Sequence, residues 1–187
     1  KDRYESFRTL NFENADNAVE IINSDCLHTR IAAMHSIAAF DNINGIPSLI
    51  CRLNAVSQWE RLTAVYSLGA LGQTAIEYLV AALNDSANDN DGDPMAKFWN
   101  ENAISMDDAS HALAAIGEPS IEPLISLLEH SNEWVRINAA FALGEMDSIA
   151  AKAVPSLTRC LDDESHCMVR LVADILSTIR QHHECFI

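Results

Sequence analysis

The sequence predicts an all-α protein, an α-solenoid (superhelix) of about five helix-turn-helix repeats. Three observations predict this fold. A segment that begins with arginine recurs along the chain, a second apolar segment precedes each copy, and no stretch shows the sustained alternation that is typical of β-strands. Because one helical hairpin cannot bury its apolar face alone, successive hairpins must stack on one another.

The arginine segment marks the second helix of each repeat. Residues 61–69 (RLTAVYSLG) and 136–144 (RINAAFALG) are its clearest copies. The frame recurs in three weaker copies, of which the second has Met106 in place of the arginine: residues 30–38, 106–114 and 170–178. We expect the residue three positions after this anchor to be buried. The small residues eight positions after it would let neighbouring helices approach closely, and Gly72 and Gly117 would end their helices as αL caps.

A segment upstream of each anchor marks the first helix. Its apolar residues recur at offsets of three or four and seven, which places them on one face of a helix. Pro47 and Pro155 fall in the first turn of these helices, where the missing N–H costs little. Aligned between repeats, the apolar residues form three columns: Ala15, Ile46, Ile76, Ile121 and Val154; Ala18, Leu49, Leu79, Leu124 and Leu157; and Ile22, Leu53, Leu83, Leu128 and Leu161.

These segments predict a single repeat domain over residues 14–181. Residues 1–13 would form an N-terminal cap and residues 182–187 a C-terminal tail. Because the chain begins at Lys1 without Met and without a signal-like segment, we expect it to be part of a longer protein. The third of the predicted repeats contains an acidic insertion at residues 85–105, and the five cover residues 14–41, 45–72, 75–117, 120–147 and 152–181.

The fourth repeat resembles a HEAT repeat. Its two segments are residues 121–128 (IEPLISLL) and 131–144 (SNEWVRINAAFALG), and the chain is more narrowly similar to the short, armadillo-like HEAT repeats of the phycobilisome-lyase (PBS lyase) type. The resemblance implies an α-solenoid whose second helices line the concave side. It also implies a structural role for the repeat arginine, which ties its helix to a loop or to the next repeat. We expect that role here, with Asp25 or Asp163 nearby, in preference to anion binding.

The composition argues against several classes of partner. Acidic residues number 27 and basic residues 12, and the formal charge of −15 would repel nucleic-acid phosphates and anionic membranes alike. No apolar run approaches the roughly 20 residues of a membrane-spanning helix. The five cysteines are odd in number and never spaced as Cys-x-x-Cys, which favours reduced thiols and a cytoplasmic location.

No metal, cofactor or catalytic site is expected. Several His and Cys residues lie near the C-terminus, but Cys167 and His182 would sit at the two ends of one helix, about 22 Å apart at 1.5 Å per residue. Such residues cannot hold one zinc ion. The His and Cys residues occupy unrelated repeat positions, so no nucleophile and base can be paired, and there is no Gly-rich phosphate loop.

The insertion predicts an exposed acidic loop rather than a calcium site. Residues 85–93 are rich in Asp and Asn, but an EF-hand frame centred on Gly92 would place Ala87 and Phe98 where carboxylates are required. The amphiphilic segment at residues 95–99 follows. We expect it to pack over the inner face of the solenoid as a lid or contact loop, with Trp99 as a partner-binding residue.

The positions one and five residues after each anchor predict a binding surface. They turn away from the buried stripe and are normally polar, yet here they are mostly apolar, aromatic or histidine. Aligned by stacking, they would form an exposed apolar stripe along the inner groove, which commonly marks an interaction site. The alternative is that they pack against the second helix of the adjacent repeat. The candidate partner-binding residues are Ile31, His35, Leu62, Tyr66, His111, Ile137 and Phe141, with Leu171 and Ile175 at these positions in the fifth repeat.

The leading functional hypothesis is a non-catalytic protein–protein interaction or scaffold module. Its partner would be another protein or a flanking domain of its own chain. The alternative is an enzyme-associated role in chromophore attachment, as in the bilin lyases that resemble this repeat. That role would need exposed Arg or Lys for the propionates of the chromophore, and this chain has few basic residues to spare.

The fifth repeat is expected to pack on something further. Apolar residues occupy nearly all sides of its second helix, whereas a terminal repeat needs a polar outer face. We therefore expect contact with a missing domain, self-association with a second copy of the chain, or cover by the C-terminal tail at residues 185–187.

Overall fold

The computed structural model of the protein describes residues 15–88 and 108–184. Most of the residues in these two ranges are helical, and none of them lies in a strand. The α-helices are α2 (Ala15–Ile21), α3 (Leu27–Ala39), α4 (Ile46–Leu53), α5 (Gln58–Leu71), α6 (Ile76–Asn88), α8 (Asp108–Ile116), α9 (Ile121–Leu127), α10 (Glu133–Glu145), α11 (Val154–Arg159) and α12 (His166–Glu184). The all-α prediction is confirmed.

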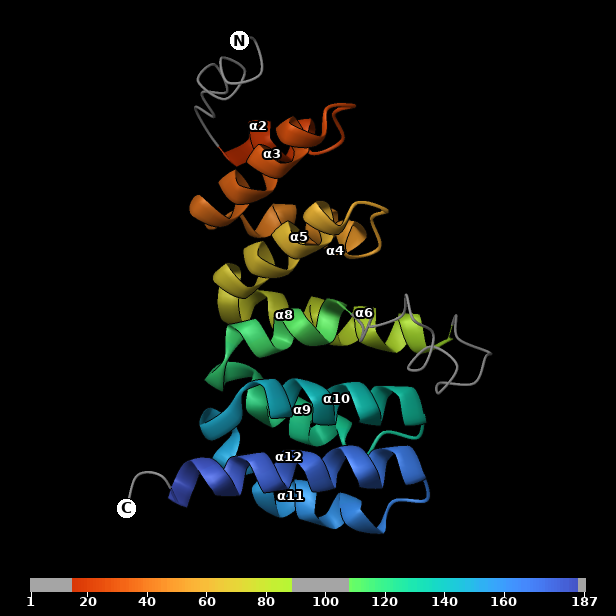
Figure 1. The fold of residues 1–187 in the computed structure, drawn as a ribbon. Coiled ribbons are helices and arrows are strands. Elements are labelled where there is room, and N and C mark those ends of the chain that lie inside the picture. Colours follow the sequence, from red (N-terminus) through yellow and green to blue (C-terminus); the bar gives the residue numbers. More distant parts are fainter. Residues whose placement is uncertain (1–14, 89–107, 185–187) are drawn as a thin grey trace.

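The helices pair in chain order, and the pairs stack into a column (Figure 1). α2 packs against α3, α4 against α5, α6 against α8, α9 against α10, and α11 against α12. The second helices also pack on one another, α3 on α5, α5 on α8, α8 on α10 and α10 on α12. Short 3₁₀ turns join each pair to the next: Ile43–Gly45, Gly72–Ala75, Glu118–Ser120 and Asp147–Ala153. This arrangement is an α-solenoid, as predicted.

Two predicted boundaries differ from the structure. α6 continues to Asn88, so the start of the predicted acidic insertion is helical, and the rest of that insertion, residues 89–105, lies outside the described residues. α12 continues to Glu184, so it includes residues that were assigned to the tail. The predicted N-terminal cap, residues 1–13, also lies outside the described residues.

Aliphatic side chains between the two layers of helices form the core. The predicted middle column of the first helices is fully buried, at Ala18, Leu49, Leu79, Leu124 and Leu157. So is the alanine three residues after the anchor in the first four pairs, at Ala33, Ala64, Ala109 and Ala139. Leu161 departs from the prediction. α11 gives way to a 3₁₀ turn at Cys160–Asp162, whose tighter winding turns Leu161 to the solvent and buries Cys160 instead.

The last second helix is one residue out of register with the prediction. α3, α5 and α10 each begin three residues before the anchor arginine. α12 begins at His166, which places its anchor position at Val169 and not at Arg170. Burial agrees with this shift, because Val172 is buried and Ala173 is exposed. Aligning Arg170 with the other arginines by residue type was therefore wrong.

The shifted register gives α12 a polar outer face. Arg170, Asp174, Ser177 and Thr178 are exposed. The apolar residues of this helix are buried, at Met168, Val172, Ile175 and Ile179, or half-buried, at Val169, Leu171 and Leu176. The expectation that this helix shows an apolar surface is therefore wrong for its described side chains. The predicted self-association through the last repeat stays a prediction.

The residue eleven positions after the anchor reverses the chain with a positive φ in four pairs. Asp41 and Asp147 both have φ 51°. Gly72 has φ 61° and ψ −135°, and Gly117 has φ 80° and ψ −138°. The two glycines end their helices, as predicted, but they are not αL caps, which have ψ near about +47°. Their conformation lies in a region of the φ/ψ map that is essentially limited to glycine.

An arginine fork ties three of the pairs to the pair that follows. In each fork, Nη1 of the anchor arginine donates to the carbonyl oxygen of the residue six positions earlier in its own repeat. The three bonds run from Arg30 to Ser24 (2.7 Å), from Arg61 to Ala55 (2.9 Å) and from Arg136 to His130 (3.0 Å).

The rest of each guanidinium pairs with a carboxylate of the following repeat. This confirms the structural role of the arginine. The partner of Arg30 is Glu60 of α5, and Asp25, which the sequence placed near it, is not the acceptor. The distances are 2.7 Å from Arg30 Nε to Glu60 Oε1, 3.1 Å from Arg61 Nε to Asp108 Oδ2, and 2.9 Å from Arg136 Nε to Asp163 Oδ2.

The fork of Arg136 is the most enclosed of the three that the described residues form. Its two side chains, those of Arg136 and Asp163, are 8% and 11% exposed. Burial acts to raise the pKa of Asp163, but the hydrogen bonds from Arg136 and from the backbone N–H of Ser165 outweigh it and hold that pKa below its usual value. The hydrogen bond to Asp163 in turn raises the pKa of Arg136.

Replacing Asp163 with Asn should lower the free energy of unfolding by about 3 kcal/mol at neutral pH, because Arg136 would keep a buried charge without its partner. The folded pKa of Asp163 is depressed, so the pair stabilises the protein fully above the unfolded pKa of about 4 and loses this effect as the pH falls through the folded pKa. Urea unfolding of wild type and Asp163→Asn should thus converge at acid pH. A difference independent of pH would contradict this assignment.

Close contact between α5 and α8 generates a second prediction. A Cβ added to Gly69 would lie 2.9 Å from the Cβ of Ala115, which has no rotamer to move away. Gly69→Ala should therefore destabilise the protein by about 1–3 kcal/mol despite the better helix propensity of alanine. In an Ala115→Gly background the same change should stabilise it by about 1 kcal/mol. Thermal unfolding of the four variants measures both effects, and an equal effect in both backgrounds would rule out the contact.

Candidate functional site

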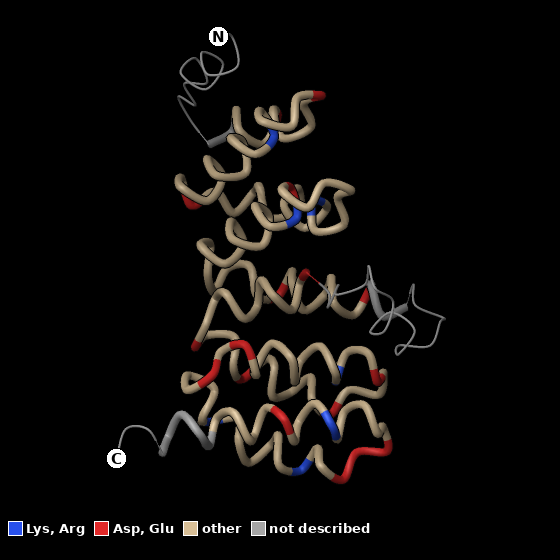
Figure 2. Tube along the Cα trace, in the orientation of Figure 1, with Lys and Arg blue, Asp and Glu red and all other residues tan. Residues whose placement is uncertain are grey.

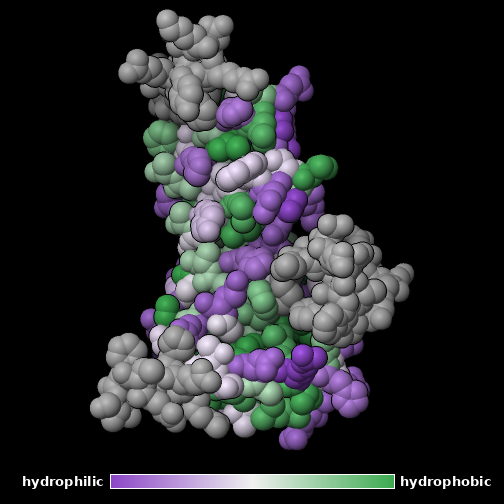
Figure 3. Space-filling model, viewed as in Figure 1, coloured by the Kyte–Doolittle hydropathy of each residue, from purple (hydrophilic) through white to green (hydrophobic). Residues whose placement is uncertain are grey.

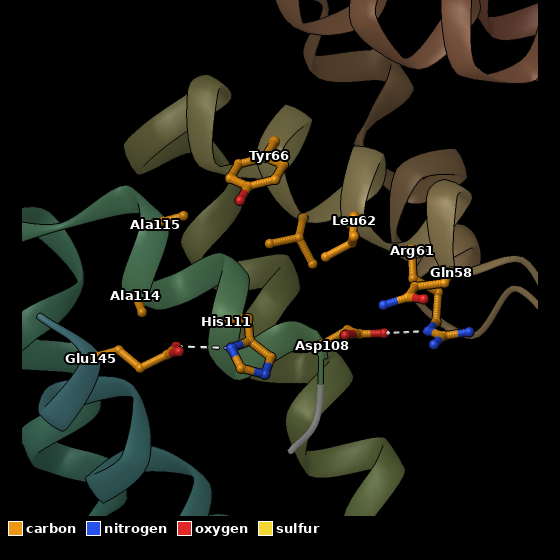
Figure 4. Close-up of a pocket in the computed structure, with 10 residues that line it drawn as sticks. Gln58, Arg61, Leu62, Tyr66, Asp108, His111, Ala114, Ala115 and Glu145 are labelled. Atoms are coloured by element: carbon orange, nitrogen blue, oxygen red, sulfur yellow. Dashed lines mark hydrogen bonds and ion pairs between the residues drawn. The ribbon is translucent and has the colours of Figure 1, made fainter. Parts of the chain in front are cut away.

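A cavity of about 400 Å³ lies between α5 and α8, beside the end of α10 (Figure 4). Ala114 and Ala115 of α8 form part of its wall, and because their side chains end at Cβ they leave the space open. Tyr66 and Leu62 of α5 lie on the other side. The full lining is Gln58, Arg61, Leu62, Val65, Tyr66, Asp108, His111, Ala114, Ala115 and Glu145.

Two polar pairs hold the helices around the cavity in place. Arg61 of α5 pairs with Asp108 of α8 at 3.1 Å, which is the forward half of its arginine fork. His111 of α8 lies with Nδ1 2.8 Å from Oε2 of Glu145 at the end of α10. The His111 ring also meets the Phe141 ring edge-on, with 5.3 Å between ring centres. The cavity therefore has a fixed shape made by three successive second helices.

Three large apolar side chains stand exposed on the face of α5 beside the cavity. Trp59, Leu62 and Tyr66 are spaced by three and four residues, so they share one helix face, which we call the α5 stripe. Their exposed fractions are 70%, 39% and 66%. Leu62 and Tyr66 also line the cavity. The α5 stripe and the cavity thus form one continuous surface with apolar and polar parts.

The structure brings together three of the predicted partner-binding residues and separates the others. Leu62, Tyr66 and His111 line one cavity. Ile31, half-buried, and His35, exposed, lie on α3 and do not line it. Trp99 lies outside the described residues.

The predicted stripe does not run the length of the solenoid. Ile137 is 3% exposed and belongs to the core, because α10 is enclosed between α8 and α12, and Phe141 is half-buried. In the last repeat the corrected register puts Arg170 and Asp174 at these positions. The alternative, packing against neighbouring helices, therefore holds for the fourth repeat. On the face in Figure 3, hydrophobic patches alternate with hydrophilic ones and do not form a continuous band.

Several lining residues were not identified from the sequence. Gln58, Val65, Ala115 and Glu145 fall outside the two positions on which the prediction rested. Trp59, two residues before the anchor, was also not identified. The equivalent residue of the fourth repeat, Trp134, is buried, so this repeat position gives no consistent signal of exposure. The adjacent small residues Ala114 and Ala115 were a usable signal, since a gap opposite large residues makes a hollow.

The described residues contain no group of three or more His, Cys, Asp or Glu side chains arranged to hold a metal ion. α12 runs unbroken from His166 to Glu184, so it separates the His and Cys residues that were considered for zinc. In the same part of the chain no helix is long and apolar enough to cross a membrane.

The comparisons with known proteins agree with the repeat architecture. Residues 108–177, which span α8 to α12, match the family model of HEAT repeats, and residues 60–85, in α5 and α6, match that of the PBS lyase HEAT-like repeat. No curated protein matches the chain. The crystal structure of an engineered protein is similar at 17% identity over 89% of this chain and 96% of that one, with a TM-score of 0.32, which is too low to support an argument. On its helix pairs and these two matches, the chain belongs to the HEAT-repeat proteins.

Proposed function

We propose that this HEAT-repeat protein is a non-catalytic binding module that holds a segment of a partner protein on the α5 stripe and in the adjoining cavity. The observation that supports the proposal most is the exposure of Trp59, Leu62 and Tyr66 beside a cavity of about 400 Å³. Large exposed apolar side chains gathered next to a hollow are the usual anatomy of a protein interaction site.

The occupant that fits this site is a segment with one large aliphatic or aromatic side chain. That side chain would enter the cavity between Leu62 and Tyr66 on one side and Ala115 on the other. Tryptophan and tyrosine are enriched among the residues that dominate binding energy, because they bury a large rigid area with a polar group at its edge. The paired Arg61 and Asp108 and the paired His111 and Glu145 keep the site preformed, which lowers the entropic cost of binding.

No observation on the described residues favours the alternative role in chromophore attachment. A bilin needs cationic groups for its propionates. Arg61 is the arginine that lines the cavity, and its guanidinium is engaged with Asp108 and with the carbonyl oxygens of Ala55 and Val56.

The proposal predicts that binding and stability respond differently at the α5 stripe. Peptides selected from a random displayed library on the wild-type protein should bind Tyr66→Ala and Leu62→Ala at least about tenfold more weakly, as expected at a binding hot spot. The free energy of unfolding should fall by less than about 1 kcal/mol for Tyr66→Ala, because that side chain is 66% exposed. For Leu62→Ala, whose side chain is 39% exposed, it should fall by about 1–2 kcal/mol, less than for a core leucine. Isothermal titration calorimetry and urea unfolding give the two quantities.

Tyr78→Ala is the matched control, since Tyr78 is a 47% exposed aromatic residue on α6 that does not line the cavity. It should leave peptide affinity unchanged. Ile137→Ala should instead cost about 2–5 kcal/mol of stability, as a core residue. Selected peptides that bind Tyr66→Ala as tightly as the wild type, or the failure of any peptide to be enriched, would refute the site.

A further inference from the structure

We propose that the segment held at the α5 stripe and cavity is basic, with lysine or arginine side chains flanking the apolar anchor. This inference rests on the proposed function and adds the charge of the partner to it. The distribution of charges in and around the cavity supports it.

The lining of the cavity has an excess of negative charge. Its ionisable groups are Arg61, Asp108, His111 and Glu145. The charge of Arg61 is balanced by Asp108, and its Nη1 is also satisfied by two carbonyl oxygens of its own loop. Counted over Arg, Asp and Glu alone, the lining holds one cation and two carboxylates. The second carboxylate, that of Glu145, has its Oε2 2.8 Å from Nδ1 of His111, and the Glu145 side chain is 36% exposed. A cation that approached this side of the cavity would meet Glu145 directly.

The C-terminal ends of the second helices carry negative potential along one edge of the solenoid, and the end of α10 on this edge lies at the cavity. A helix carries roughly half a negative charge at its C-terminus, and natural helices often place Lys or Arg there. α3, α5, α8 and α10 have no basic residue in their last turns. α10 instead ends on Glu145, and Asp41 and Asp147 follow α3 and α10 closely. Figure 2 shows acidic segments at the left edge of the column, near the ends of α3 and α10.

Most of the basic residues in the described part of the chain are already neutralised. These residues pair with carboxylates within the fold. An acidic partner would therefore find few available cations, and the remaining carboxylates would repel it. The pairs, besides Arg61 with Asp108, are Arg30 and Arg52 with Glu60, Arg136 with Asp163, Lys152 with Glu118, and Arg159 with Glu129.

Three synthetic helical peptides of equal length test the inference. Each has a single tryptophan, flanked by lysines in one peptide, by glutamines in the second and by glutamates in the third. Fluorescence anisotropy gives the affinity, and the methyl NMR signals of Ala114, Ala115 and Leu62 report whether the cavity is occupied. The lysine peptide should shift these signals and bind about tenfold more tightly than the glutamine peptide at low salt, as expected for a few screened charge pairs. This preference should fall as salt rises, and the glutamate peptide should bind most weakly.

Glu145→Gln should weaken the lysine peptide several-fold, whereas Glu77→Gln, an exposed carboxylate on α6 away from the cavity, should not. Equal binding of the lysine and glutamine peptides, with cavity signals shifted by both, would overturn the inference and leave the proposed function intact. If no peptide shifts the cavity signals, both fail. The lysine peptide could also bind without shifting the cavity NMR signals and without any effect of Glu145→Gln. Such binding would be general attraction to an acidic surface, and it would also overturn the inference.

Discussion

The arginine fork determines how one helix pair sits on the next. Each guanidinium donates backward to a carbonyl oxygen in its own loop and forward to a carboxylate of the following repeat, as Arg136 does to His130 and Asp163. Both groups are largely removed from water, so their desolvation is offset only when all the hydrogen bonds are made together. This makes the fork sensitive to relative position. Apolar packing alone would allow helix pairs to slide, whereas a bidentate pair of fixed geometry allows one placement.

The position of the cavity follows from this constraint. At the interface of α5 and α8, Arg61 and Asp108 fix one end of the helix contact, and Gly69 against Ala115 fixes the other. Between these points the small side chains of α8 cannot fill the space opposite Leu62 and Tyr66. In the third repeat the sequence has Met106 at the anchor position, and His111 with Glu145 joins α8 to α10 by a different pair. The same pair supplies the polar side of the cavity, so the departure from the repeat pattern lies at the proposed site.

Much of the fold was predictable from the sequence because the repeat restates each position several times. Leu49, Leu79 and Leu124 are buried as their shared column predicted, and a misjudged residue in one repeat is corrected by the others. Errors arose where one repeat departs from its relatives. Residue type predicts Arg170 as an anchor, although α12 places Val169 there, and Leu161 is exposed because a 3₁₀ turn shortens α11. The register of a helix within its repeat depends on the residue at which the helix starts. The identity of a single residue does not reveal that starting point.

The candidate site was only partly predictable, for a different reason. The positions one and five after the anchor identify the helix face of Leu62, Tyr66 and Ile137 equally well. Whether that face is exposed depends on how closely the neighbouring second helices lie, and this differs between α5 and α10. Ile137 is buried where Leu62 is not. The adjacent small residues Ala114 and Ala115 indicate a gap, but the repeat period alone does not show that Leu62 and Tyr66 lie opposite it.

A crystal structure of the protein with the lysine-flanked tryptophan peptide would test the central claim most directly. We expect the tryptophan ring between Leu62, Tyr66 and Ala115, with a lysine ammonium within hydrogen-bonding distance of the Glu145 carboxylate. A peptide seated on the first helices, or beside the forks of Arg30 and Arg136, with the cavity between α5 and α8 left empty, would contradict it.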